Sequence, residues 1–238
     1  MNKFLKKYLS GILSWRNFIK DIRRRYVIPQ QRKMYNYCHE SAILEMPFDI
    51  SNYKNISIGP YTKIRKGFIF LGKKGSFTIK KYSAIAMNCI VVTDGHTPTL
   101  CVPHILGGAL HINDKITDIV VNEGVWIGMN CILLPGTNIG RGSIVGAGSI
   151  VNKVIPPYAV AVGSPAKIIA STFTIDEILI HEEALYPPEE RLSRDKLETI
   201  FETYYAGKKS IGCSSIPSEL RSEVEKQLYH IRQQIENN

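Results

Sequence analysis

The strongest constraint in this sequence is a six-residue repeat between Val121 and Ile155. Every sixth residue is a branched aliphatic, and the residue four positions after each one is small or β-branched. A helix repeats near 3.6 residues and a strand alternates at 2, so neither explains a sustained period of six. A parallel β-helix does, because three hexads close one triangular coil and each inward aliphatic stacks on those of neighbouring coils. The aliphatics are Val121, Ile127, Leu133, Ile139, Val145 and Val151, and the corner residues are Val125, Cys131, Thr137, Ser143, Ser149 and Ile155.

The remaining sequence divides the chain into three parts. The hexad pattern begins imperfectly near residue 56 and is lost over residues 97–118. Residues 174–206 and 217–236 instead carry apolar residues at helical spacing. We therefore predict a basic N-terminal helical arm at residues 1–48, a β-helix at 49–170 and a helical extension at 171–238. The inserted loop at about 97–118 is either a functional protrusion or a flexible excursion.

Charge is distributed unevenly between these parts. Residues 1–33 carry ten Lys or Arg against one acidic residue, whereas residues 171–238 carry eight against thirteen. Apolar residues recur every three or four positions over residues 1–26, which predicts an amphipathic helix. Such a helix either rests on an anionic membrane face or packs on the β-helix or on another subunit. No nucleic-acid-binding motif accompanies the basic residues, so we expect no nucleic-acid partner.

The five cysteines are scattered along the chain, at positions 38, 89, 101, 131 and 213. This spacing favours reduced thiols in a cytoplasmic protein over a disulfide framework or a zinc site. No apolar run approaches the ~20 residues that span a bilayer, and no signal peptide is recognisable. We expect a cytoplasmic protein, peripheral at the inner membrane face if the basic arm binds lipid.

Several motifs in residues 56–170 resemble the hexapeptide-repeat acyltransferases, particularly the galactoside, maltose and capsule-sugar O-acetyltransferases. They are Val125-Trp126-Ile127-Gly128, Leu134-Pro135-Gly136, the run from Ile144 to Val151, Ile155-Pro156-Pro157, Val162-Gly163-Ser164-Pro165-Ala166, and upstream Ile85-Ala86-Met87-Asn88 and Gly95-His96. The resemblance implies a left-handed parallel β-helix and a homotrimer with acetyl-CoA bound between adjacent subunits. It implies O-acetylation of a sugar or glycan in bacterial surface polysaccharide, such as capsule, with no metal required.

The resemblance also places the catalytic groups. The catalytic histidine of the family falls on His96. Histidine suits a general base because its ordinary pKa lies near neutral pH. The backbone N–H of Met129 falls where the family stabilises the oxyanion. Asn88 either shapes the site or is an ordinary corner residue. His104 and His111 lie in the same loop as His96, where they could contact the acceptor.

The expected coenzyme site follows the coils beside this centre. Gly128 and Ala147 let a thin pantetheine arm lie close to the backbone, and Trp126 lines its channel or caps a coil. By resemblance the other contacts are Met129, Asn152, Lys153 and, at the phosphates, Lys167.

Two questions stay open at the sequence level. Arg65 and Lys66 either pair with an acidic sugar, in an acceptor site shared with Asn88 and Trp126, or form a solvated corner. Asp94 either orients His96 or forms a turn before Gly95. The alternative functions are N-acetylation of an amino sugar or xenobiotic, and a non-catalytic scaffold.

Overall fold

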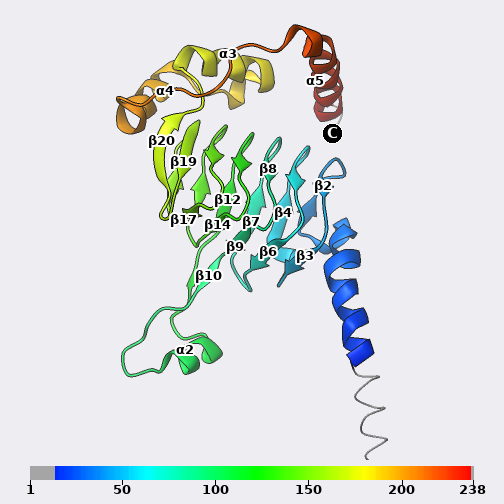
Figure 1. Cartoon of the computed structure of the whole chain (residues 1–238). Helices are drawn as coiled ribbons and strands as arrows, with labels where there is room; N and C mark the ends of the chain where they lie inside the picture. Colours follow the sequence, from blue (N-terminus) through cyan, green and yellow to red (C-terminus); the bar gives the residue numbers. More distant parts are fainter. Residues whose placement is uncertain (1–13, 237–238) are drawn as a thin grey trace, which may run out of the picture.

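A stack of short strands forms the centre of the molecule (Figure 1). The structure is a computed structural model that describes residues 14–236. Its strands line the three sides of a triangular coil, and each step along a side advances the chain by one coil. Within each side the coil strands pair in parallel. This arrangement confirms the predicted parallel β-helix.

Each of the three sides of the stacked coils is one sheet. The first contains, in spatial order, β1 (Tyr37–Cys38), β4 (Ile56–Ile58), β7 (Phe77–Ile79), β12 (Ile119–Val121), β15 (Asn138–Ile139) and β18 (Val154–Ile155). The second contains β2 (Ile43–Leu44), β5 (Lys63–Ile64), β8 (Ala84–Ile85), β13 (Trp126–Ile127), β16 (Ile144–Val145), β19 (Ala159–Val162) and the antiparallel β20 (Lys167–Ser171). The third contains β17 (Ile150–Val151), β14 (Ile132–Leu133), β9 (Ile90–Val92), β6 (Phe68–Leu71) and β3 (Phe48–Ile50).

The six-residue repeat builds the core as predicted. All six aliphatics of the repeat are at most 1% exposed, and Ile127 stacks between Ile85 and Val145 of the adjacent coils. The corner residues are also buried. Ser143 shows why polar residues fit there: its hydroxyl donates to the Pro156 carbonyl at 2.8 Å and accepts from the Ala159 amide at 3.1 Å. A small side chain therefore satisfies the backbone groups that a tight corner leaves unpaired.

The N-terminal segment is helical and leads directly into the first coil. Residues 14–22 are α-helical, and residues 1–13 of the predicted helix lie outside the described part of the chain. Strands β1 and β2 already belong to the solenoid, so the first coil starts within the segment that we assigned to the arm. Tyr35 covers the end of the core, and its hydroxyl donates to the Pro29 carbonyl. The short helical turns here are η1 (Arg23–Val27, π-helical), η2 (Ile28–Gln30), η3 (Arg32–Met34) and η4 (Tyr53–Asn55).

A long excursion leaves the solenoid between β9 and β12, where the hexad pattern is lost. Its base is an antiparallel pair, β10 (Asp94–Gly95) with β11 (Lys115–Ile116), and α2 (His104–Leu110) lies at its tip (Figure 1). The coils on both sides of the excursion remain paired, β7 with β12 and β9 with β14. The excursion is thus an insertion that leaves the stack in register.

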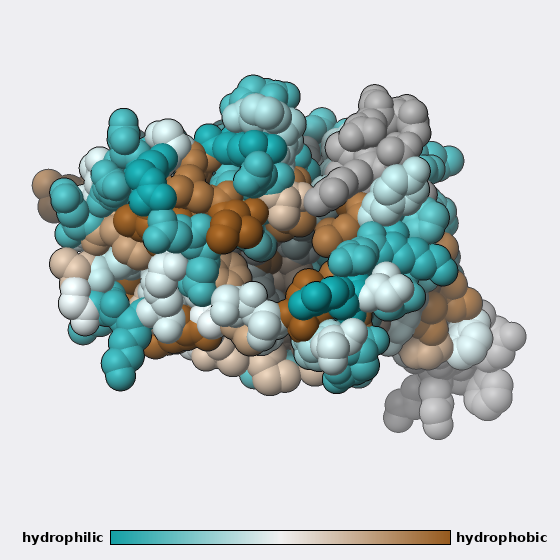
Figure 2. Space-filling view, turned by 90° about the horizontal axis from the view of Figure 1, so that it is seen from above, coloured by the Kyte–Doolittle hydropathy of each residue, from teal (hydrophilic) through white to brown (hydrophobic). Residues whose placement is uncertain are grey.

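The C-terminal extension is helical, in agreement with its apolar spacing. It contains α3 (Ile175–Leu185), η5 (Pro188–Glu190), α4 (Arg194–Ile200), η6 (Phe201–Tyr205), η7 (Ser218–Leu220) and α5 (Arg221–Glu236). In the view from above the orientation of Figure 1, hydrophilic side chains cover much of the surface, with hydrophobic ones between them (Figure 2). Over the described residues, no helix combines the length and the apolar character needed to cross a membrane.

A buried carboxylate joins this extension to the last coils. Glu182 of α3 is 1% exposed and accepts hydrogen bonds from the Tyr158 hydroxyl at 2.7 Å and from Arg141 Nη1 at 2.9 Å. The Leu192 amide donates to the same carboxylate at 3.1 Å. Burial and the bond to Glu182 raise the pKa of the Tyr158 hydroxyl far above its ordinary value, so this hydroxyl stays protonated and donates.

We expect Glu182→Ala to lower the free energy of unfolding by about 3–5 kcal/mol, because it leaves the buried Tyr158 hydroxyl without its acceptor and removes one of the two carboxylates that pair with Arg141. Glu183→Ala removes an exposed neighbouring carboxylate and should cost less than about 0.5 kcal/mol. Chemical denaturation of both variants measures the difference. Equal stabilities would show that Glu182 does not hold the extension to the coils.

Candidate active site

His96 stands at the base of the excursion, directly after β10. Its side chain is 53% exposed and is flanked by the far strand of the excursion and by α2. A β-carbon added to Gly108 of α2 would lie 3.6 Å from His96 Nε2, so the helix passes close to this nitrogen. The imidazole therefore reaches solvent while its neighbours limit how it can turn.

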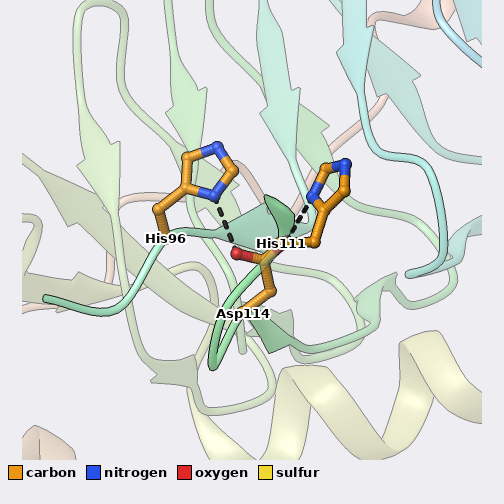
Figure 3. A group of neighbouring side chains, drawn as sticks. All are labelled: His96, His111 and Asp114. Carbon is orange, nitrogen blue, oxygen red and sulfur yellow. Dashed lines mark hydrogen bonds and ion pairs between the residues drawn. The ribbon is translucent and has the colours of Figure 1, made fainter. Parts of the chain in front are cut away.

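A chain of hydrogen bonds ends at His96 (Figure 3). His96 Nδ1 lies 2.8 Å from Oδ1 of Asp114, and His111 Nδ1 lies 2.7 Å from Oδ2 of the same carboxylate. On the other side of His111, its Nε2 lies 3.1 Å from Lys73 Nζ. One aspartate thus bridges two imidazoles, and a lysine closes the far end.

The donors and acceptors in this chain fix the tautomers. A lysine ammonium has only donors, so His111 Nε2 must accept from Lys73 and its ring proton must sit on Nδ1. That proton is donated to Asp114, whose other oxygen accepts the Nδ1 proton of His96. The Nε2 of a neutral His96 is consequently left with its lone pair. These two hydrogen bonds, first the one from His96 and then the one from His111, lower the pKa of Asp114, which keeps it ionised.

Asp94 does not take this orienting role. Its carboxylate accepts backbone N–H bonds from Lys73, Lys74 and Gly75 at 2.6–3.1 Å, together with the Thr93 hydroxyl. These donors lower the pKa of Asp94 against the opposing effect of its burial. Asp94 is thus a strand residue of β10 that binds a turn of the preceding coil, and it does not form the predicted turn before Gly95. The residue that orients His96 is Asp114, which we did not identify from the sequence.

A largely apolar cleft of about 300 Å³ lies at another corner of the coils. It is formed where successive coils present small residues at the turn after the second sheet. Its lining residues are Arg65, Ala86, Met87, Trp126, Gly128, Met129, Ile144, Val145, Gly146 and Ala147. Five residues that we predicted to bind the coenzyme or the acceptor are thus brought together here: Arg65, Trp126, Gly128, Met129 and Ala147.

The backbone of this cleft offers a free donor. The Gly128 amide donates to Val145 and the Asn130 amide donates to Met87. Between them, the Met129 amide donates to no acceptor within residues 14–236. The coils also approach closely, since a β-carbon on Gly128 would lie 2.5 Å from the Ala147 nitrogen. A thin, partly polar ligand can therefore lie along this backbone.

Other predicted site residues lie outside the cleft lining. Asn88 occupies an exposed corner in the left-handed conformation, with φ of 60°, which matches the corner interpretation. Lys66 is exposed at the corner beside it, and its carbonyl accepts from the Asn88 amide. The remaining three, Asn152, Lys153 and Lys167, are exposed near the end of the solenoid. Arg65 is ion-paired with Glu45 at 2.9 Å, and this carboxylate also binds Lys63.

In one chain, His96 and Met129 lie at opposite ends of the third sheet. Met129 is aligned with Met87 at the corner that precedes β9, whereas His96 follows the far end of that strand. The extended residues 89–94 between these two corners span roughly 16 Å. The base candidate and the cleft are therefore separate within a single copy.

Two histidines and a carboxylate also form a ligand set that suits a metal ion. The donor atoms of His96, His111 and Asp114 lie within 4.8 Å of one another. However, both Nδ1 atoms already donate to Asp114, and the Lys73 ammonium faces His111. A cation bound to the two Nδ1 atoms would have to displace both of their protons beside an existing positive charge, so the arrangement fits proton handling better than metal binding.

Comparison with known proteins identifies relatives of the repeat region. A family model described as bacterial transferase hexapeptide (six repeats) matches residues 118–153. The putative acetyltransferase YJL218W of Saccharomyces cerevisiae is 32% identical over 139 residues, which are 58% of this chain and 67% of that protein. The putative acetyltransferase C18B11.09c of Schizosaccharomyces pombe is 59% identical over 49 residues, or 21% of this chain. These matches cover between 24% and 67% of the relatives' own length.

A solved structure shares the fold. The hexapeptide-repeat acetyltransferase VCA0836 from Vibrio cholerae, complexed with acetyl-coenzyme A, superposes with a TM-score of 0.55 at 27% sequence identity. The superposition covers 62% of this chain and 76% of that one.

We expect Asp114→Asn to mix the two tautomers of His96, because an amide can accept from or donate to the imidazole whereas the carboxylate only accepts. The histidine ¹⁵N shifts in selectively labelled protein measure this. Wild-type His96 in its neutral form should show protonated Nδ1 and unprotonated Nε2, and the variant should show intermediate shifts. Asp118→Asn, which alters an acceptor for the Ser76 amide in the same excursion, is the control. Unchanged shifts in Asp114→Asn would contradict the hydrogen-bond chain.

Proposed function

Because the chain belongs to the hexapeptide-repeat transferase family, we propose that it transfers an acetyl group from acetyl-CoA to a hydroxyl of a sugar or glycan, with His96 as general base. The observation that carries this proposal is the hydrogen bond between His96 Nδ1 and Asp114, which leaves the lone pair on Nε2 without a donor among the described residues. An alcohol is a poor nucleophile until its proton can leave, and in this proposal His96 Nε2 accepts that proton.

The chemistry needs no covalent intermediate on the protein. His96 Nε2 takes the hydroxyl proton while the oxygen attacks the thioester carbonyl. The negative charge that develops on the carbonyl oxygen is stabilised by the Met129 amide, which has no acceptor in the described chain. When the tetrahedral intermediate collapses, the carbon–sulfur bond breaks, and the imidazolium returns the proton to the coenzyme A thiolate.

The coenzyme occupies the cleft beside Met129 in this proposal. The pantetheine arm lies where Gly128 and Ala147 bring two coils close together, against Trp126, whose side chain is 55% exposed. Asn152, Lys153 and Lys167 lie further along the stack, where two ammonium groups meet the phosphates of the coenzyme. No residue of this arrangement requires a metal ion.

A second copy of the chain completes the site, because His96 and Met129 cannot meet within one copy. We propose a homotrimer in which His96 of each subunit serves the cleft of its neighbour. The tip of the excursion supports this. It contains no charged residue between positions 97 and 113 apart from its histidines, and it exposes Leu100, Ile105 and Leu110 by 68–92%. An uncharged apolar surface of this kind fits a protein partner.

The acceptor is a sugar of bacterial surface polysaccharide, such as capsule, modified at the cytoplasmic side. This part of the proposal follows the motif resemblance of residues 56–170. Arg65 lines the cleft, but Glu45 already binds it. An acidic sugar would therefore have to compete with an existing carboxylate, and an acceptor panel should include neutral as well as acidic saccharides.

We expect His96→Ala to lower kcat by at least about 100-fold, since general-base catalysis contributes on that order. Release of free thiol from acetyl-CoA, measured with a panel of neutral and carboxylated oligosaccharides, reports the reaction. His104→Ala removes an exposed histidine of the same excursion and is the matched control. Equal rates in His96→Ala and wild type would move the base elsewhere. No thiol release with any acceptor would favour the non-catalytic scaffold, and release only with acceptors that carry a free amine would favour N-acetylation.

The shared site has its own test in mixed oligomers. His96→Ala removes the base, and Ala147→Phe fills the cleft at an exposed position. If each site combines one subunit's base with the next subunit's cleft, every mixed trimer holds one intact site. Equal mixing of the two inactive variants, by unfolding and refolding together, should therefore restore about a quarter of the wild-type activity. No recovery in trimers shown to be mixed would place both groups in one subunit.

A further inference from the structure

The helix at residues 14–27 carries an apolar stripe that nothing in the described chain covers. Its apolar residues recur at spacings of three and four, which places them on one side of a helix. Every residue from 14 to 27 is exposed. The side chains of the stripe are Trp15 (62% exposed), Phe18 (54%), Ile19 (49%), Ile22 (40%) and Tyr26 (48%).

Basic residues border this stripe. Arg16, Lys20 and Arg23 have no acidic partner among the described residues, whereas Arg25 pairs with Asp21 within the helix. No other acidic residue occurs between positions 14 and 33. The helix therefore presents an apolar stripe with positive charge beside it, and the stripe includes aromatic side chains.

The rest of the molecule holds this helix at one end. Arg24 forms an ion pair with Asp49 of β3, and the Tyr53 hydroxyl lies 3.4 Å from the Arg24 carbonyl. Figure 1 shows that the helix projects from the first coil, across the direction in which the coils stack. Its N-terminal half therefore stands clear of the solenoid while its base is fixed to β3 and the turn at Tyr53.

We propose that this helix lies on an anionic lipid surface, with its apolar stripe in the headgroup boundary and its basic residues against the lipid phosphates. Helices with this combination of stripe and charge bind at the membrane interface, and aromatic residues are favoured there. The proposal does not depend on the catalytic function. If both hold, the enzyme works beside a membrane, where acceptors attached to lipid are present.

Charge favours lipid over a second copy of the chain as the occupant. Identical helices packed stripe to stripe would bring Arg16, Lys20 and Arg23 of each copy near those of the others without a neutralising acid. The excursion near α2 is apolar and lacks charge over positions 97–113, so it has no such conflict. The apolar stripe of the helix at residues 14–27 and the apolar tip of the excursion thus suit different partners.

The test is co-sedimentation of the full chain with vesicles of phosphatidylcholine alone or with about 30% phosphatidylglycerol. We expect binding only to the anionic vesicles, weakened by salt. Trp15→Ser with Phe18→Ser should weaken binding at least about 10-fold. Arg16→Gln with Lys20→Gln should weaken it by roughly 30-fold, since each basic residue near such a surface contributes about fivefold.

Matched controls separate this proposal from its alternatives. Ile180→Ser removes a 69%-exposed aliphatic on α3 and should bind as wild type does, and so should His96→Ala, whatever its activity. Binding of the Trp15/Phe18 variant that equals wild type would overturn the proposal, as would equal binding to neutral vesicles. A change of oligomeric state in that variant, measured by light scattering, would show that another copy covers the stripe instead.

Discussion

Backbone pairing between successive coils is the constraint on which the rest of this structure depends. Each strand pairs residue by residue with the strands above and below it, so Trp126 lies between Ala84 and Ile144, and Ile127 between Ile85 and Val145. The same register aligns the corners. When the small residues Gly128 and Ala147 occupy one corner in adjacent coils, the surface is hollow there. The cleft is thus a consequence of stacking, not of a separate loop.

This register also explains which parts of the molecule the sequence predicts. The buried column and the cleft residues Trp126, Gly128, Met129 and Ala147 all lie inside regular hexads, where position in the repeat determines position in space. The first coil keeps the six-residue spacing at Cys38, Leu44 and Ile50. It was harder to recognise because Cys38 is not a branched aliphatic and because η4 separates Ile50 from Ile58, the next inward residue, by eight positions. The helical extension was recognisable from the helical spacing of its apolar residues, but the buried carboxylate that holds it to the coils, Glu182, was not. The burial of Glu182 depends on Tyr158 and Arg141, far from it in the sequence.

The two aspartates near His96 show where sequence reasoning ends. Asp94 is two residues from His96, yet its oxygens are occupied by the amides of a turn in the preceding coil. Asp114 is eighteen residues away and holds the imidazole, because the β10–β11 pair folds the excursion back on itself. Lys73, whose amide binds Asp94 in that turn, also reaches His111 through its ammonium group. A segment without a period gives no register, and so its contacts cannot be read from spacing. In the folded chain, the pairing of Gly95 with Lys115 places their neighbours His96 and Asp114 side by side.

The rigidity of the flat sheets decides how the proposed catalytic groups can cooperate. The strand between the cleft corner and His96 pairs with β6 and β14 on its two sides, so it cannot bend to bring Met129 and His96 together. The excursion instead extends outward from its β10–β11 base, which places the oriented imidazole and the apolar tip on the same protruding element (Figure 1). The apolar surface that we propose to bind another copy and the proposed base, which lies away from its own cleft, are therefore joined in one segment. Association and catalysis would then depend on the same insertion, and removing α2 would affect both even though no residue of α2 lines the cleft.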